Sequence, residues 1–137
     1  MSDKQQIRTE NGPALYGKAS RAHLAQLAMQ LLDRWELSNQ DKLELLGIPQ
    51  CTTSILARYR RGQPLPAHRD ALERVGHLLA IHKGLRLYFP HNPDIAYGWI
   101  STRNQDLGGI SPVDLIRRDG FSGLLAVRDY VESMLSN

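Results

Sequence analysis

Residues 38–62 read SNQDKLELLGIPQCTTSILARYRRG, and this stretch decides the fold. Ser38, followed three residues later by Asp41, forms a shortened capping box that opens a helix. Gly47 ends that helix as a C-terminal glycine, and a second helix then runs to Gly62. The order of helix, glycine turn, helix and glycine predicts a helix-turn-helix, which lays its second helix in the major groove of DNA.

The second helix of this stretch has an apolar face and a face of small and basic residues. Thr52 or Thr53 caps it. At about 100° per residue, Ile55, Leu56 and Tyr59 gather on one side. Small residues let the backbone approach base edges, and arginines bind guanine bidentately or neutralise phosphate. The residues expected to contact DNA are therefore Thr53, Ser54, Ala57, Arg58, Arg60 and Arg61.

Two considerations leave this DNA site open. Clustered arginines often form only a solvated surface, or favourable charges at a helix C-terminus. The connector from Gly47 to Thr52 is also longer than the three-to-four-residue turn of the common motif, so the angle of the second helix is open. Arg69 and Arg74 are candidates to extend the basic patch.

Helical patterns flank this stretch on both sides. Residues 1–19 are polar, and we expect a flexible arm whose Leu15-Tyr16 pair docks on the body. Ser20 then caps a helix with an apolar stripe formed by Leu24, Leu27, Leu31 and Trp35. A long helix is expected from about Ala67 to Leu87, with a stripe formed by Leu72, Val75, Leu78, Leu79, His82, Leu85 and Arg86.

Three further helices are expected near the C-terminus. Asn92-Pro93 begins one whose inner face carries Ile95, Ala96, Trp99 and Ile100. Ser111-Pro112 begins a short helix that ends at Gly120. Ser122 begins the last helix, on which Leu124, Val127, Val131 and Leu135 share one face.

The predicted fold class is all-α, because no sustained alternation of apolar and polar residues indicates a strand. An N-terminal helix-turn-helix unit is joined by a long helix to a small C-terminal helical domain. The expected parts are a flexible arm (1–19), a helix-turn-helix domain (20–66), a connecting helix (67–90) and a C-terminal domain (91–137). Each half alone is near the size at which a core becomes marginal, so we expect packing between the halves or across a dimer.

Composition bounds the class of protein without assigning a function. The 137 residues carry a net charge of +3, a mild basic excess that permits a nucleic-acid partner without requiring one. Cys51 is the only cysteine, which excludes an intramolecular disulfide and fits a reducing compartment. Neither a long apolar span nor an apolar signal segment occurs, so we expect a cytoplasmic protein with no membrane contact.

The motifs of common enzymes are missing from the sequence. G-x-S-x-G, P-loop and G-x-G-x-x-G patterns do not occur. The five histidines, His23, His68, His77, His82 and His91, include no pair at the i, i+4 spacing of a helical zinc site. We therefore expect neither enzymatic activity, nor a metal site, nor a cofactor.

The most distinctive string is WISTRNQDLGGISPVDLI, residues 99–116. Gly108-Gly109 permits positive φ and a tight reversal. Asn104 can tie the loop to its own backbone, and Ser111 can cap the helix that follows. Each residue therefore has a sufficient structural reason to be there.

The pattern W-x4-N-x2-L-G-G-x-S-P-x-D-L-I resembles the toxin-binding domain of the Xre/MbcA/ParS antitoxins. Upstream, residues 55–62, Arg74-Val75 and residues 87–90 resemble the Xre-like helix-turn-helix of the same proteins. The resemblance covers roughly residues 20–135 and implies a type II antitoxin. In that family the C-terminal domain blocks a RES-domain toxin, which consumes NAD or transfers ADP-ribose from it. The N-terminal domain dimerises and binds operator DNA in the promoter of its own operon.

The resemblance also implies roles for individual positions. The matching positions, expected mainly to build the domain, are Trp99, Asn104, Leu107, Gly108, Gly109, Ser111, Pro112 and Asp114. Arg103 departs from the pattern, since relatives often have a proline there. The expected toxin-binding residues lie on the last helix and are Arg128, Tyr130, Met134 and Leu135. For Leu135, as for Val127 and Val131, ordinary core is the favoured alternative.

Two other functions remain open from the sequence. One is a solitary dimeric helix-turn-helix transcription regulator without a toxin partner. The other is a purely protein-binding module whose helix-turn-helix no longer binds DNA.

Overall fold

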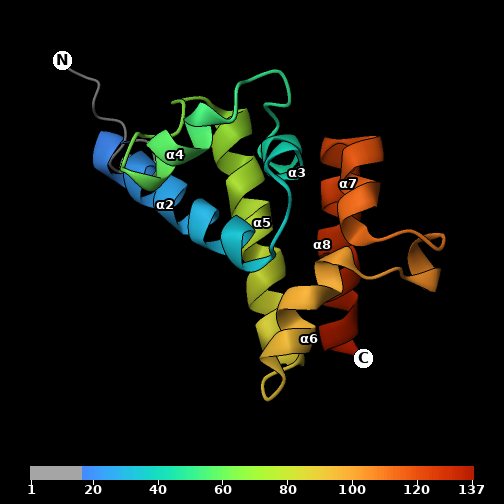
Figure 1. Cartoon of the computed structure of the whole chain (residues 1–137). Helices are drawn as coiled ribbons and strands as arrows, with labels where there is room; N and C mark the ends of the chain where they lie inside the picture. The colour runs from blue at the N-terminus through green and yellow to red at the C-terminus, as the bar shows by residue number, and fades with distance from the viewer. Residues whose placement is uncertain (1–16) are drawn as a thin grey trace.

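The computed structural model describes residues 17–137, and these residues are all-α as predicted (Figure 1). Within this range the only β feature is an isolated bridge between Asn104 and Ile110. The expected contact of Leu15-Tyr16 lies outside the described residues.

Seven α-helices and two 3₁₀ turns make up the described chain. They are α2 (Lys18–Arg34), α3 (Asn39–Leu45), α4 (Ser54–Arg60), α5 (Arg69–Tyr88), α6 (Pro93–Gly98), η2 (Trp99–Ser101), η3 (Gln105–Leu107), α7 (Pro112–Asp119) and α8 (Phe121–Ser136). The long helix α5 is the spine, against which α2, α6 and α8 pack. Helix α4 lies on α2 near one end of α5, and α6 lies at the other end (Figure 1).

The local signals for helix ends are confirmed where a side chain caps the backbone. Ser38 Oγ accepts a hydrogen bond from the Asp41 amide at 3.1 Å, and Ser111 Oγ accepts one from the Asp114 amide at 3.1 Å. Gly47, with φ of 77°, ends α3. Other boundaries differ by a few residues: α2 begins at Lys18, before Ser20, and His68 caps α5 by accepting the Ala71 amide.

A single hydrophobic core runs through both halves of the chain. Buried side chains from α2, α3, α4, α5, α7 and α8 belong to one cluster, and α3 packs directly on α7. The expected packing between the halves is therefore confirmed. In α2 the buried face is centred on Ala25, Ala28 and Leu32, and the small alanines leave room for the neighbouring helices. The predicted Leu24 and Leu27 are only half-buried.

Three side chains predicted to face inward are exposed. Arg86 lies on the solvent side of α5, because Ile81 and Gly84 occupy its buried face. Ile95 is 45% exposed, since only Ala96 of the short helix α6 is buried. Leu135 is 42% exposed because it lies in the last turn of α8, beyond the buried residues of that helix. Val127 and Val131 are core residues, as favoured.

Helices α5 and α8 approach closely at Gly84. A Cβ atom placed there would lie 2.5 Å from Val131 Cγ1. Gly76, on the same helix, faces open space, with nothing within 4 Å of such an atom. The two glycines of α5 therefore differ in their surroundings: Gly84 faces Val131 of α8, and Gly76 faces open space.

We expect Gly84→Ala to lower the free energy of unfolding by about 1–3 kcal/mol, because the added methyl group forces α8 away from α5. The matched control Gly76→Ala should raise it by about 0.5–1 kcal/mol, since alanine favours the helix more than glycine does. Urea unfolding followed by circular dichroism measures both. Equal effects of the two substitutions would contradict the close packing of α5 on α8.

Candidate functional site

Helix α4 presents the amphipathic pattern that its sequence predicts. Leu56 and Tyr59 are 1% and 4% exposed, and they pack against the core beneath the helix. Ile55 and Ala57 are half-buried at its edge. The residues that face solvent are Thr53, Ser54, Arg58, Arg60 and Arg61. Burial of Tyr59 raises the pKa of its phenol, which fits a side chain turned to the core.

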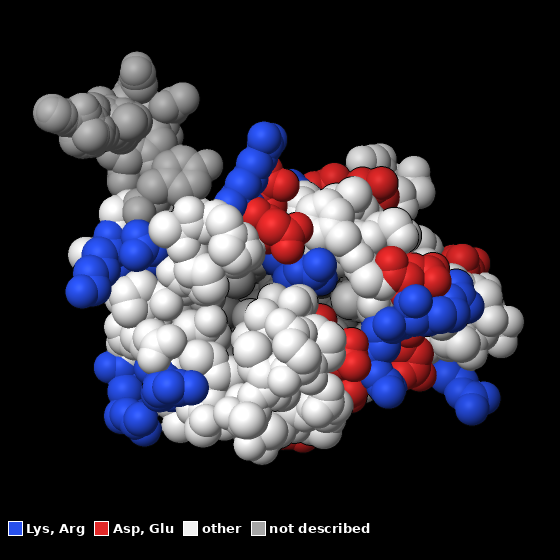
Figure 2. Space-filling view, turned by 90° about the horizontal axis from the view of Figure 1, so that it is seen from above, with Lys and Arg blue, Asp and Glu red and all other residues white. Residues whose placement is uncertain are grey.

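Arg58 and Arg61 are free cations on this surface. Neither is within ion-pair distance of a carboxylate belonging to residues 17–137. Figure 2 shows basic side chains without acidic neighbours on the side of the molecule where α2 and α4 lie, whereas the opposite side mixes the two charges. Such a patch attracts a polyanion such as DNA. The small side chains of Thr53 and Ser54 leave room for the polyanion to approach the helix backbone closely.

Arg60 is held differently from its neighbours. Its Nε and Nη2 donate to the two carboxylate oxygens of Asp33 on α2 at 2.9 and 2.8 Å. Lys42 of α3 donates to the same carboxylate at 2.7 Å. We call Asp33, Lys42 and Arg60 the Asp33 cluster. The hydrogen bond from Arg60 is the main cause that lowers the pKa of Asp33 to about 2, and Lys42 adds to it.

The Asp33 cluster fixes the position of α4 relative to α2 and α3, which the long connector does not. The connector from Leu46 to Thr53 is longer than a common helix-turn-helix turn. The Asp33 cluster instead joins α3 and α4 through α2. The sequence could not reveal it, because Asp33 and Arg60 are 27 residues apart.

Arg69 and Arg74 were the two arginines expected to extend the basic patch, and for Arg74 this prediction is wrong. It is only 9% exposed, and its guanidinium lies over the ring of Phe121, 5.4 Å from the ring centre. Gly47 packs against the Arg74 side chain, so any Cβ at that position would collide with it. Arg74 therefore links the α3–α4 connector to the start of α8. Arg69 is exposed and pairs with Glu73 at 2.6 Å.

The distinctive loop after α6 is closed by Asn104. Its side-chain oxygen accepts the Asp106 amide at 2.9 Å, and its carbonyl accepts the amides of Leu107 and Gly109. Gly108 and Gly109 both have positive φ, 87° and 83°, which glycine adopts without strain. The loop then leads through the Ser111 cap and Pro112 into α7.

Tyr130 of α8 fastens this loop to the helix bundle. Its ring stacks on Trp99 with centroids 6.0 Å apart, and its hydroxyl donates to Asp106 at 2.7 Å. That bond to the carboxylate raises the pKa of Tyr130. The role of Tyr130 inside the fold was not expected, since its place off the apolar stripe suggested a binding residue.

The other three residues expected to bind the toxin differ in their exposure and in their contacts within the fold. Arg128 pairs with Glu132 at 3.0 Å and donates to His77 Nδ1 at 2.9 Å. Burial, and next the Arg128 charge, lower the pKa of His77, so its ring accepts this bond in the neutral form. Met134 is half-buried against the core, whereas Leu135 projects into solvent.

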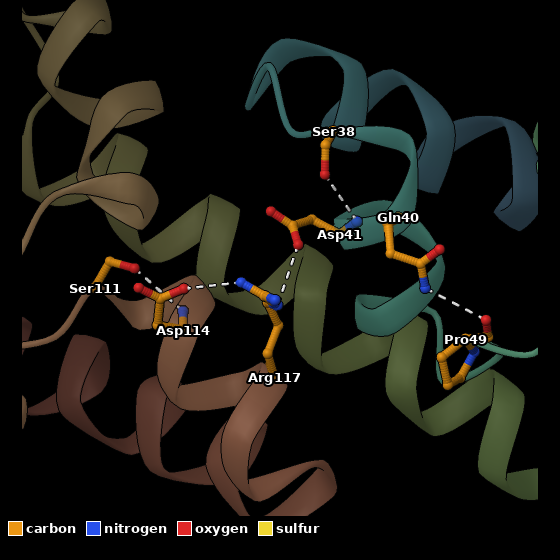
Figure 3. A network of polar contacts seen from close by, with 7 residues as sticks. All are labelled: Ser38, Gln40, Asp41, Pro49, Ser111, Asp114 and Arg117. Carbon is orange, nitrogen blue, oxygen red and sulfur yellow. Dashed lines mark hydrogen bonds and ion pairs between the residues drawn. The ribbon is translucent and has the colours of Figure 1, made fainter.

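Helix α7 is bound to α3 by Arg117 (Figure 3). Its Nε lies 3.2 Å from Asp41 of α3, and its Nη1 lies 3.2 Å from Asp114 of its own helix. Both carboxylates follow serine caps, so Arg117 bridges two helix N-termini. The same close-up shows Gln40 donating to the Pro49 carbonyl at 3.3 Å, which closes the connector after α3.

No helix within residues 17–137 is long and apolar enough to span a membrane. The same residues contain no group of three or more His, Cys, Asp or Glu that could hold a metal ion. Cys51 is half-buried in the connector, as a free thiol.

Comparison with known proteins adds two findings. The family model of the antitoxin Xre/MbcA/ParS C-terminal toxin-binding domain matches residues 84–136. The match begins inside α5, at the glycine against which α8 packs. A protein of Sinorhizobium fredii (strain NBRC 101917 / NGR234), named "Uncharacterized protein y4oB", is 34% identical over 104 residues, which are 76% of this chain and 78% of that protein.

The matched domain identifies an antitoxin of a toxin-antitoxin system, which has a toxin as its partner. The chain belongs to the Xre/MbcA/ParS family of antitoxins. The resemblance inferred from residues 99–116, which we call the W-to-I motif, is thereby confirmed.

Replacing Asp33 with Asn is expected to lower the free energy of unfolding near pH 7 by about 1 kcal/mol, since solvent screens its partly exposed carboxylate. The pKa of Asp33 is lower in the folded than in the unfolded chain. The stabilisation is therefore present above about pH 4 and is lost as the pH falls towards 2. Urea unfolding of both proteins across this pH range measures it.

Asp119→Asn is the matched control, because the exposed Asp119 pairs only with the adjacent Arg118. We expect it to unfold like the wild type. A deficit of Asp33→Asn that stays constant down to about pH 2 would show that packing, not charge, holds α4.

Proposed function

We propose that this antitoxin neutralises a RES-domain toxin through its C-terminal domain and represses its own operon by binding operator DNA as a homodimer. The matched toxin-binding domain, residues 84–136, carries the first half of the proposal. Arg58 of α4 and Arg61 just after it, which form no ion pair within residues 17–137, support the second. Because operator DNA is in the cytoplasm, the proposal places the protein there.

An exposed apolar surface at the end of α5 and α8 supports toxin binding. Leu87 and Tyr88 are 59% and 46% exposed, and Leu135 is 42% exposed. Leu135 lies beside α5 at this level, since a Cβ at Gly84, one turn before Tyr88, would lie 3.6 Å from Leu135 Cδ1. We call Leu87, Tyr88 and Leu135 the apolar surface. Exposed apolar groups gathered in this way are typical of protein interfaces.

The DNA half of the proposal rests on α4 and its rigid support. Arg58 and Arg61 face solvent, and no carboxylate of the described part of the chain pairs with them, while Arg60 anchors the helix to Asp33. A homodimer would present two copies of α4 to paired half-sites, as helix-turn-helix proteins do.

The first test of toxin binding is a pull-down of the tagged full chain from its native host, washed at high salt and identified by mass spectrometry. A stoichiometric RES-domain protein encoded by the adjacent gene supports the proposal. A preparation that holds this chain alone, and that binds its promoter, would favour a solitary regulator instead.

Leu135→Glu is expected to weaken binding of that toxin at least tenfold, because it places a charge in the apolar surface. Leu125→Glu is the matched control, since Leu125 is 36% exposed on the same helix but is outside that surface. Isothermal titration calorimetry measures both. Equal toxin affinity for the two variants would remove the end of α8 from the interface.

Arg58→Ala and Arg61→Ala are each expected to weaken binding to the promoter by about 1–3 kcal/mol if they contact bases. For the wild type, log K should fall with log salt by about 0.9 per phosphate neutralised. Fluorescence anisotropy at several salt concentrations measures both quantities. Arg118→Ala is the control, since Arg118 pairs with Asp119 on α7. Unchanged affinity of both α4 variants would exclude α4 as the DNA-reading helix.

A further inference from the structure

A basic cleft lies beside the C-terminal half of α5. This end of α5 is the one far from α4 (Figure 1). It has a volume of about 830 Å³ and runs between the C-terminal half of α5, helix α6 and the end of α2. Arg34 of α2 lines it together with His82, Lys83 and Arg86 of α5. Among the described residues, no aspartate or glutamate lines it.

The cations of this cleft are unpaired. Arg34, Lys83 and Arg86 form no ion pair with any carboxylate in the part of the chain that the structure describes. Elsewhere on the surface, Arg60 and Arg117 are both neutralised by aspartates. The cleft therefore concentrates positive potential that no carboxylate of residues 17–137 neutralises by an ion pair.

Arg34 is positioned across the cleft by Tyr97 of α6. Its Nη1 donates to the Tyr97 hydroxyl at 2.7 Å, and its guanidinium lies 5.4 Å from the ring centre. The same ring stacks on His82, with centroids 5.4 Å apart. Burial lowers the pKa of His82, and the charges of Arg86 and Arg34 lower it further, in agreement with the positive field.

The surroundings of the cleft fit a protein segment better than a small anion. Its three cations are all exposed, whereas a small-molecule site encloses most of its ligand. Leu87 lines the cleft and also belongs to the apolar surface. The two features are therefore continuous, as in an interface whose apolar centre has a charged rim.

The neighbouring hollow limits how such a segment can lie. It is about 620 Å³ in volume, shares Arg34 and Tyr97 with the cleft, and is lined by Glu36 and Asp94. A negatively charged segment is repelled there, so it must enter the cleft from the side of α5 and the apolar surface.

We propose that the basic cleft receives an acidic segment of the toxin, next to the apolar surface. This inference rests on the proposed function and adds the chemistry of the contact. Arg34 and Lys83 lie outside the matched residues 84–136, and Arg34 belongs to the helix that carries α4 through Asp33. The toxin-binding surface is therefore composite, and α2 takes part in it.

The experiment compares the full chain with the double variant Lys83→Glu/Arg86→Glu and with Arg34→Gln. Lys18→Glu/Arg103→Glu is the matched control for the double variant, because it changes the net charge equally at exposed positions outside the cleft. The probes are the RES-domain protein recovered by the pull-down, an acetylated hexaglutamate peptide, pyrophosphate and the promoter fragment. Toxin affinity is measured by calorimetry at 50 and 300 mM NaCl, and peptide binding by amide chemical shifts. Circular dichroism verifies folding.

We expect the double variant to bind the toxin at least tenfold more weakly at 50 mM NaCl, and Arg34→Gln at least threefold more weakly. The control variant should bind like the wild type. The hexaglutamate peptide should shift the amides of Lys83, Arg86 and Tyr97 in the wild type, and the double variant should lose these shifts.

Any one of four results would overturn the inference. If the wild type binds the toxin and the cleft variants bind it equally well, only the inference fails and the proposed function stands. If the wild type binds no toxin, the proposed function fails and the inference falls with it. If pyrophosphate binds the cleft more tightly than the peptide, or if the double variant loses promoter binding instead, the cleft is a site for phosphate groups.

Discussion

The Asp33 cluster is the constraint on which the arrangement of the N-terminal helices depends. One carboxylate on α2 accepts hydrogen bonds from Lys42 of α3 and Arg60 of α4. The connector between α3 and α4 is too long to set their angle by itself, and α4 packs chiefly on α2. Asp33 therefore positions the surface that carries Arg58 and Arg61. Removal of Asp33 would leave Lys42, whose side chain is only 10% exposed, without its counter-charge.

The spine α5 connects this unit to the C-terminal domain. Near its start, Arg74 packs between Gly47 of the connector and Phe121 of α8. Near its end, Gly84 admits Val131, so α8 lies close along the spine. Arg117 adds an ion pair from α7 to α3. The two units therefore share one core and are fixed relative to each other, while their proposed binding surfaces lie at opposite ends of α5.

The sequence predicted well what is encoded locally. The caps at Ser38 and Ser111, the glycine after α3 and the two faces of α4 all follow from neighbouring residues. The W-to-I motif identified the family because its turn and cap chemistry is confined to one short segment.

What the sequence could not predict depends on distant contacts. Asp33 and Arg60 are far apart in the chain, and nothing near Arg74 indicates that Phe121 covers it. Leu135 continues the apolar stripe of α8, yet it is exposed because α8 extends beyond its buried contacts. The basic cleft combines residues of α2, α5 and α6, which no spacing within one helix could reveal.

On the proposed function, one chain carries a toxin surface and a DNA surface at opposite ends of α5. Size-exclusion chromatography with light scattering on the full chain, its toxin and a fragment of its own promoter tests whether both surfaces bind at once. We expect a single ternary complex containing all three, since neither partner covers the other's surface. Displacement of the DNA by the toxin, with only binary complexes at saturating concentrations, would contradict it.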